Sequence, residues 1–129
     1  FANMNGAQLS GAQLIKADIQ QAFVQYADLG GTLFNDANLS GVNFLGAKMN
    51  KVNFNNADLS RADLRMSNLD EAILLGTELN KALVDSNWVE KLSDWRLTGS
   101  KEIQSSYHVI SDSLDQWKHP VYHLRKIEK

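Results

Sequence analysis

The residues from Met4 to Val84 repeat with a period of five, and this period limits the folds that the chain can adopt. A large apolar residue recurs at every fifth position, and a small residue, most often alanine, lies two positions before it. On an α-helix, five residues advance the chain by about 500°, so these apolar residues would scatter around the helix. On a strand they would point to opposite faces in turn, because five is an odd number. Neither regular element can bury this pattern.

The pattern can be buried if the chain turns in the same direction after every five residues and coils into a tube. Stacked coils then pair like parallel strands, about 4.8 Å apart, and each coil covers the core of its neighbour. The position before the large residue is often Asn or Asp, whose side chains bond to nearby backbone. Glycines mostly follow the large residue, where a corner needs a permissive backbone. The large residues, called centres below, are Met4, Leu9, Leu14, Ile19, Val24, Leu29, Phe34, Leu39, Phe44, Met49, Phe54, Leu59, Leu64, Leu69, Leu74, Leu79 and Val84.

The tandem motif A-(D/N)-L-x-x, as in Ala57-Asp58-Leu59, resembles the pentapeptide repeat family and covers residues 2–86. In that family, four pentapeptides form one square coil of a right-handed quadrilateral parallel β-helix. The resemblance therefore implies an all-β solenoid of about four coils. It does not imply one function, because the family has many unrelated roles.

With four pentapeptides to a coil, every fourth centre lies on the same side of the tube. Side one carries Met4, Val24, Phe44, Leu64 and Val84, and side two carries Leu9, Leu29, Met49 and Leu69. Side three carries Leu14, Phe34, Phe54 and Leu74, and side four carries Ile19, Leu39, Leu59 and Leu79. We therefore expect Phe34 and Phe54 to stack one coil apart, with Phe44 reaching them from the opposite wall.

The repeat ends after Val84, and we expect residues 1–86 to form the β-helix and residues 87–129 a C-terminal capping segment. The stretch DSNWVEKLSDWRLTG predicts one helix that is capped by Asp85 or Ser86 and ended by Gly99. One face of this helix would cover the last coil, whose core would otherwise be exposed. The residues expected on that face are Trp88, Leu92 and Trp95.

The rest of this segment predicts a short helical turn followed by a β-hairpin. The first strand is expected near residues 107–111, the loop over 112–120, and the second strand from Pro120 through VYHLRKI. His119 and His123 would share one face of the second strand, but two histidines without a nearby carboxylate or cysteine make a poor zinc site. We expect no metal and no cofactor.

Composition limits the remaining choices. The 129 residues are 43% hydrophobic and 22% charged with a net charge of −2, which is typical of a soluble domain and gives no basic surface for nucleic acid. No run approaches the roughly 20 apolar residues of a membrane span. The lack of cysteine fits a reducing or an oxidising compartment, of which we favour the cytoplasm. Phe1 reads as the last residue of a preceding pentapeptide, so we expect a fragment or a processed chain.

The sequence contains no catalytic constellation. The serines lie in no nucleophile elbow, the glycines form no phosphate loop, and nearly every Asp before Ser86 occupies a structural position of the repeat. We therefore predict a protein that is not an enzyme.

Apolar residues at outward positions are the candidate interaction surface, because contiguous exposed apolar patches usually mark contacts. On side one these residues are Phe23, Tyr26, Leu45, Met66 and Leu83. On side three they are Ile15, Leu33, Ile73 and Leu75. They can be covered in three ways: by residues 87–129 folding back, by a second copy of the chain, or by an unknown partner protein.

The predicted function is therefore a non-enzymatic protein–protein interaction scaffold or regulatory module. One alternative is a structural spacer of a larger protein. The other is a DNA mimic that binds DNA gyrase, a topoisomerase, because some proteins of the resembled family act in that way. Residues 1–86 carry nine acidic and six basic side chains, a net charge of −3, whereas duplex DNA of about 20 Å carries roughly 12 negative charges. The charge does not favour this alternative.

Overall fold

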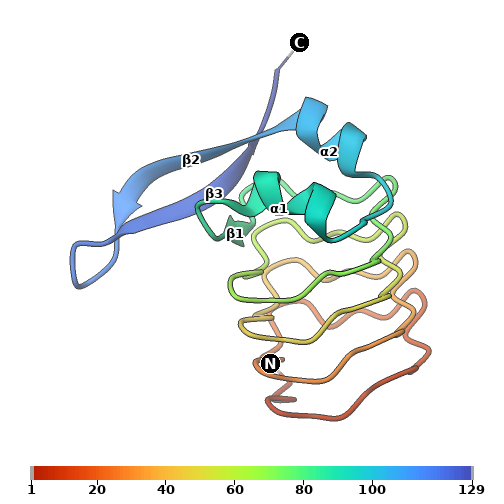
Figure 1. The fold of residues 1–129 in the computed structure, drawn as a ribbon. Coiled ribbons are helices and arrows are strands. Elements are labelled where there is room, and N and C mark those ends of the chain that lie inside the picture. The colour runs from red at the N-terminus through yellow and green to blue at the C-terminus, as the bar shows by residue number, and fades with distance from the viewer. Residues whose placement is uncertain (1, 129) are drawn as a thin grey trace.

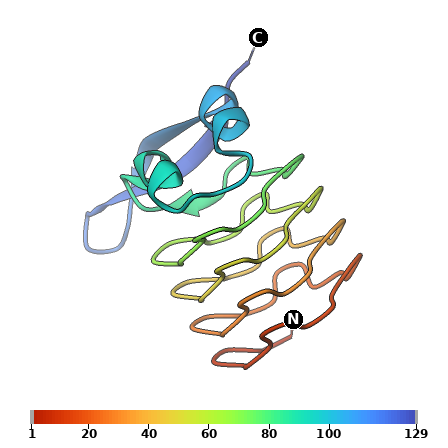
Figure 2. The ribbon, with the colours of Figure 1, turned by 45° about the vertical axis from the view of Figure 1, so that its right-hand side comes forward.

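The computed structural model describes residues 2–128 and has the architecture of a right-handed quadrilateral parallel β-helix with a C-terminal segment across one end (Figure 1). Asn3 pairs with Phe23, Phe23 with Asn43, Asn43 with Asp63 and Asp63 with Leu83, all in parallel. Four pentapeptides therefore make one coil, as predicted. The coils lie above one another as square turns in both views of the ribbon (Figure 2). The expectation for Phe1 lies outside the described residues.

The corners depend on the left-handed backbone conformation, whichever residue occupies them. Gly6 and Gly46 have φ of 71° and 67°, as expected for glycine, but Arg61 and Met66 adopt 60° and 58°. This conformation costs an L-residue roughly 1–2 kcal/mol. The hydrogen bonds and core contacts of the stacked coils offset that cost, so glycine is favourable at a corner without being required.

Asn and Asp before the centres bond to the backbone two residues later, as predicted. Asp58 Oδ1 accepts a hydrogen bond from the Ser60 amide at 2.9 Å, and Asn43 Oδ1 accepts one from the Leu45 amide at 3.0 Å. These short-range bonds satisfy amides that the coil-to-coil ladder does not use.

Aromatic rings fill the middle of the tube. The Phe34 and Phe54 rings are stacked with centroids 5.6 Å apart and planes 2° apart. Phe44 approaches both edge-on, with centroids 6.2 Å away. All three side chains are fully buried, and the stacking that the resemblance implied, with four pentapeptides to a coil, is confirmed.

The C-terminal segment contains two short helices and a hairpin that joins the last coil. The elements are β1 (Leu83–Val84), α1 (Trp88–Asp94), α2 (Ser100–Ser106), β2 (Tyr107–Leu114) and β3 (Pro120–Lys126). They form an antiparallel sheet of order β1-β3-β2, with Leu83 opposite His123 and Ile110 opposite His123 on the other edge. The hairpin therefore continues side one beyond the solenoid. The first strand of the hairpin extends further than the predicted residues 107–111.

The prediction of one helix from Asp85 or Ser86 to Gly99 is wrong. α1 begins after Asn87 and ends at Asp94, and its first residue is not capped by a side chain. The Asp85 carboxylate instead accepts a hydrogen bond from the Met66 amide at 3.0 Å. Gly99 has φ of 98° and directly precedes α2, where a Cβ atom would lie 2.7 Å from the Leu74 carbonyl oxygen.

The helix ends early because the following residues pair with the open edge of the last coil. The amide of Glu71 donates to the carbonyl of Trp95 at 2.6 Å, and the amide of Thr98 donates to the carbonyl of Ala72 at 2.9 Å. Trp95 therefore lies at the helix end and contacts Trp88 edge-to-face, with ring centroids 6.3 Å apart. The hydrogen bonds that pair the backbone edge of the last coil stabilise the protein more than another turn of helix would.

The hairpin covers a second part of the same edge. The Lys81 amide donates to the Leu124 carbonyl at 2.7 Å, and the Leu124 amide donates to the Ala82 carbonyl at 2.9 Å. Leu124 is fully buried together with Trp88 and Leu92 of α1. Within the described residues, no helix is both long and apolar enough to cross a membrane.

Tyr107 ties the hairpin to the core, and its replacement by phenylalanine is expected to destabilise the protein by roughly 1–3 kcal/mol. Its hydroxyl oxygen accepts a hydrogen bond from the buried Leu79 amide at 3.0 Å, and that amide would lose its partner. Burial raises the pKa of Tyr107 above its usual 10.0. The corresponding stability is fully present below pH 10.0 and is lost as pH rises through the higher folded-state pKa. Urea denaturation at rising alkaline pH should show this loss in the wild type and a smaller loss in Tyr107→Phe.

Candidate interaction surface

The outward residues of side one come from three positions of the pentapeptide. Phe23 and Leu83 lie directly before their centres, where other coils of this side have Asn or Asp. Leu45 follows its centre, and Tyr26 and Met66 occupy the corner after it. Phe23, Tyr26 and Met66 are 44%, 62% and 68% exposed, whereas Leu45 and Leu83 are half-buried. The structure therefore has all five residues on one side, at the positions expected from the sequence.

Gly46 allows Tyr26 to lie flat along the corner. A Cβ atom on Gly46 would lie 2.5 Å from Cε1 of Tyr26, so the ring occupies the space above this glycine. Met66 follows in the same corner one coil further on. Tyr26, Gly46 and Met66 thus occupy the same corner in three consecutive coils, and both large side chains are exposed there.

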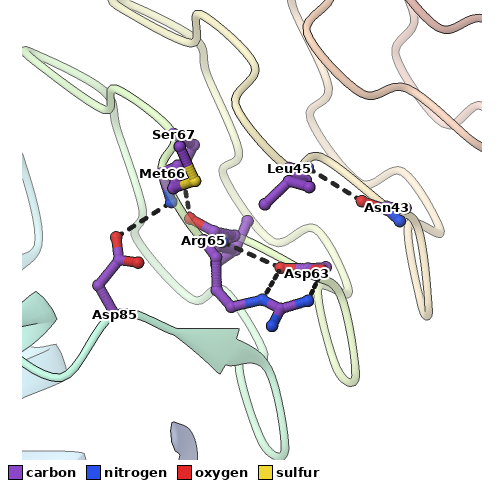
Figure 3. Close-up of polar contacts among 8 residues, drawn as sticks. Asn43, Leu45, Asp63, Arg65, Met66, Ser67 and Asp85 are labelled. Atoms are coloured by element: carbon purple, nitrogen blue, oxygen red, sulfur yellow. Dashed lines mark hydrogen bonds and ion pairs between the residues drawn. The ribbon is translucent and has the colours of Figure 1, made fainter. Parts of the chain in front are cut away.

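Polar contacts hold the backbone beneath this surface (Figure 3). Arg65 binds the Asp63 carboxylate with two bonds, from Nε at 2.9 Å and from Nη2 at 2.7 Å. The hydrogen bond to Asp63 raises the pKa of Arg65, and the nearby charges of Asp85 and Asp115 act in the same direction. The two side chains are therefore paired with each other within the wall.

Side three has a second set of exposed apolar residues. Ile15 and Leu75 are exposed, while Leu33 and Ile73 are half-buried. Ile73 also pairs with Thr98 of the C-terminal segment, which extends this side by one strand.

The interpretation that residues 87–129 fold back over an apolar side is wrong. The two helices lie over the end of the solenoid and the β2–β3 hairpin projects past one side of it in both ribbon views (Figures 1 and 2). The residues that stay exposed are Phe23, Tyr26 and Met66 on side one and Ile15 and Leu75 on side three. The backbone edge of the last coil needs partners more than the flat sides do, because its amides and carbonyls would otherwise be unpaired.

Two exposed residues near the hairpin loop were not predicted. Leu114 and Trp117 lie at the loop end of β2, and Trp117 is 69% exposed. Asp115 accepts bonds from the amides of Trp117 and His119, both at 2.9 Å, so the loop has a defined turn. The available sequence signal was that two large apolar residues, Leu114 and Trp117, fall within the predicted loop 112–120. Among the described residues, no group of three or more metal-ligating side chains is close enough together to hold an ion.

Comparison with known proteins defines the class to which this solenoid belongs. The family model of pentapeptide repeats matches residues 1–25, 24–56 and 47–83 with eight copies. The chain belongs to the pentapeptide repeat family. Proteins of this family are generally non-catalytic. A comparison with curated proteins found no match.

Several solved structures share the fold. The pentapeptide repeat protein alr5209 from Nostoc PCC 7120 is 33% identical, with 74% of this chain and 83% of that chain covered and a TM-score of 0.65. Rfr23 from the cyanobacterium Cyanothece 51142 is 30% identical, with coverage of 67% and 58% and a TM-score of 0.58. A thylakoid-lumen pentapeptide repeat protein from Arabidopsis thaliana, 19% identical over 72% and 75% with a TM-score of 0.57, is similar in fold alone.

Proposed function

We propose that this protein is a non-enzymatic interaction module that binds a partner protein through side one. The observation that carries the proposal is the exposure of Phe23, Tyr26 and Met66 on one wall whose backbone is held by the coil-to-coil ladder. A backbone that is already ordered loses little further conformational entropy on binding, which favours association. Aromatic residues and methionine are also enriched in protein interfaces.

A matched pair of double variants tests the proposal. Phe23→Lys/Met66→Lys alters side one, and Ile15→Lys/Leu75→Lys makes the same change of charge on side three. Circular dichroism first establishes that both variants are folded. In affinity capture from a lysate, we expect a partner to be retained by the wild type and the side-three variant and lost from the side-one variant.

Sedimentation of the same three proteins separates a partner protein from a second copy. If the wild type is a dimer and only the side-one variant is a monomer, side one is a self-association surface and the proposed partner is incorrect. If all three proteins capture the same partner, function does not reside on side one. If no protein is captured by any of them, the structural-spacer interpretation is favoured.

The DNA-mimic alternative has one observation in its favour. Asp18, Asp58 and Glu78 lie in one column on side four, separated by Asn38. Three carboxylates over the height of the solenoid are few compared with the roughly one charge per 1.7 Å of duplex DNA. We therefore expect the full-length protein to leave gyrase supercoiling unchanged, and inhibition of supercoiling would favour the mimic instead.

A further inference from the structure

Two neighbouring depressions lie along the corner between sides four and one and beside the hairpin. The lower part lies around Gly41, between Phe23, Arg61 and Leu83. The upper part begins at Lys81 and Leu83 and continues past His123 and Arg125 of β3. Leu83 borders both parts, and the two neighbouring depressions together are called the corner groove below.

Gly41 opens the lower part of the corner groove. The other members of its corner column are Gln21, Arg61 and Lys81, which all have long side chains. The missing side chain leaves a notch beside Phe23 that the stem of Gln21 partly fills, with Gln21 Cγ 3.2 Å from the position that a Cβ atom on Gly41 would take. The notch has an apolar wall on side one and a cationic neighbour on the corner.

The unpaired charges around Gly41 and Leu83 are positive, whereas Glu128, at the upper end of the corner groove, is an acidic residue without an ion pair among the described residues. Arg61 and Lys81 are exposed, and neither has an ion-pair partner among the described residues. Two of the acidic residues that line the corner groove, Asp63 and Asp112, are already engaged. Asp63 binds Arg65 at 2.7 Å, as seen in Figure 3, and Asp112 lies 3.5 Å from Arg125 and 3.7 Å from His123.

The dimensions of the corner groove fit an extended chain. From Phe23 through Leu83 to His123 of β3 and Asp112 of β2, the lining residues span five strand spacings of about 4.8 Å, or roughly 24 Å. An extended peptide of roughly seven residues has this length. Its alternate side chains point to opposite sides, so one set can face Phe23 and Leu83 while the other faces Arg61 and Lys81.

We propose that the corner groove binds an extended acidic segment of a partner protein, in which acidic and apolar residues alternate. This inference rests on the proposed function, because it names the chemistry of a partner that also contacts side one through Phe23. The apolar wall favours a peptide over a nucleic acid, and the two free cations favour acidic over basic peptides.

Fluorescence anisotropy with a labelled peptide of alternating glutamate and leucine tests this inference. We expect saturable binding that weakens as salt is raised, because the charges are exposed and therefore screened. Arg61→Glu/Lys81→Glu should weaken binding by about tenfold or more, since it replaces two attractions by repulsions. Lys16→Glu/Lys48→Glu makes the same change of net charge on other exposed positions and should leave binding unchanged.

A second pair of variants tests the shape of the corner groove without changing charge. Gly41→Gln fills the notch and should weaken binding of the peptide. Gly31→Gln adds the same side chain at an open corner elsewhere and should leave binding unchanged. Both glycines have φ near that of the non-glycine corners, at 70° and 69°, so the backbone cost is matched, and the two sites differ in that only Gly41 brings a close Cβ contact, 3.2 Å from Gln21 Cγ.

Three results would overturn the inference: no binding of the acidic peptide, equal binding of a lysine–leucine peptide, or tighter binding of a single-stranded oligonucleotide. Capture that depends on side one but not on Arg61 and Lys81 would leave the proposed function standing and remove only the acidic partner. If the peptide binds but capture of a partner does not depend on side one, the acidic ligand of the corner groove would stand and the proposed function would be removed.

Discussion

Replacement of Phe54 by alanine is expected to lower the free energy of unfolding by about 3–5 kcal/mol. Phe54 is fully buried, stacks on Phe34 and meets the edge of Phe44, so the variant loses buried apolar area and two aromatic contacts. The walls on all four sides are held by the coil-to-coil hydrogen bonds and cannot collapse into the cavity. Urea denaturation followed by circular dichroism measures the loss.

Phe23→Ala is the matched control for this prediction. The same atoms are removed, but the side chain is 44% exposed on side one, and we expect a loss of less than about 1 kcal/mol. Equal losses in the two variants would contradict the placement of Phe54 in the core and of Phe23 on the surface. A large loss in Phe23→Ala alone would mean that this side chain is needed for folding, and its role in partner binding would have to be tested with a smaller change.

The solenoid could be predicted from the sequence because each of its coils repeats one local rule. The centre at every fifth position fixes which residues point inward, and Asn or Asp before it fixes the turn. Each coil then pairs with its neighbour at a constant separation along the chain. The outward positions of Phe23 and Met66 follow from the period of five. The facing of Phe34, Phe44 and Phe54 also needs four pentapeptides to a coil, which the family resemblance implied.

The C-terminal segment could be predicted only in part, because its structure depends on the edge that it meets. Helical spacing of Trp88, Leu92 and Trp95 indicated one long helix, but residues 95–98 leave the helix to pair with the last coil. The local pattern does not show that the amides of Glu71 and Leu74 require partners. The same applies to the corner groove, whose upper part exists only because β3 pairs with β1.

The repeat also hides differences between equivalent positions. Gly41 and Gly46 both end a pentapeptide, yet the first opens a notch and the second lies beneath the ring of Tyr26. Each outcome depends on the residue one coil before, Gln21 in one case and Tyr26 in the other. A surface on a solenoid is therefore determined by columns of residues that are far apart in the sequence.

We propose that α1 and the hairpin act as a cap, and Trp88→Ala is expected to lower the free energy of unfolding by about 3–5 kcal/mol. Trp88 is fully buried against the last coil, and its removal exposes that coil to water. Trp117→Ala is the control in the same segment, and we expect a change within about 0.5 kcal/mol because Trp117 is largely exposed.

Trp88→Phe separates packing from hydrogen bonding at this position. The indole N–H of Trp88 is buried without a hydrogen-bond partner, a situation that costs roughly 1–3 kcal/mol. Phenylalanine keeps most of the apolar contact and removes the unpaired donor, so we expect Trp88→Phe to be clearly less destabilising than Trp88→Ala. Equal losses for the two would show that the full indole shape, and not burial alone, closes the end.

Amide hydrogen exchange in Trp88→Ala tests whether the segment protects one end of the solenoid. Each coil contacts only its neighbours, so loss of the cap should act first on the coil beside it. We expect faster exchange at Glu71, Leu74 and Lys81, whose amides bond to the C-terminal segment, and little change at Val24 and Leu29. Uniformly faster exchange along the whole tube would mean that the solenoid and the segment unfold as one unit, and the segment would then be part of a single core.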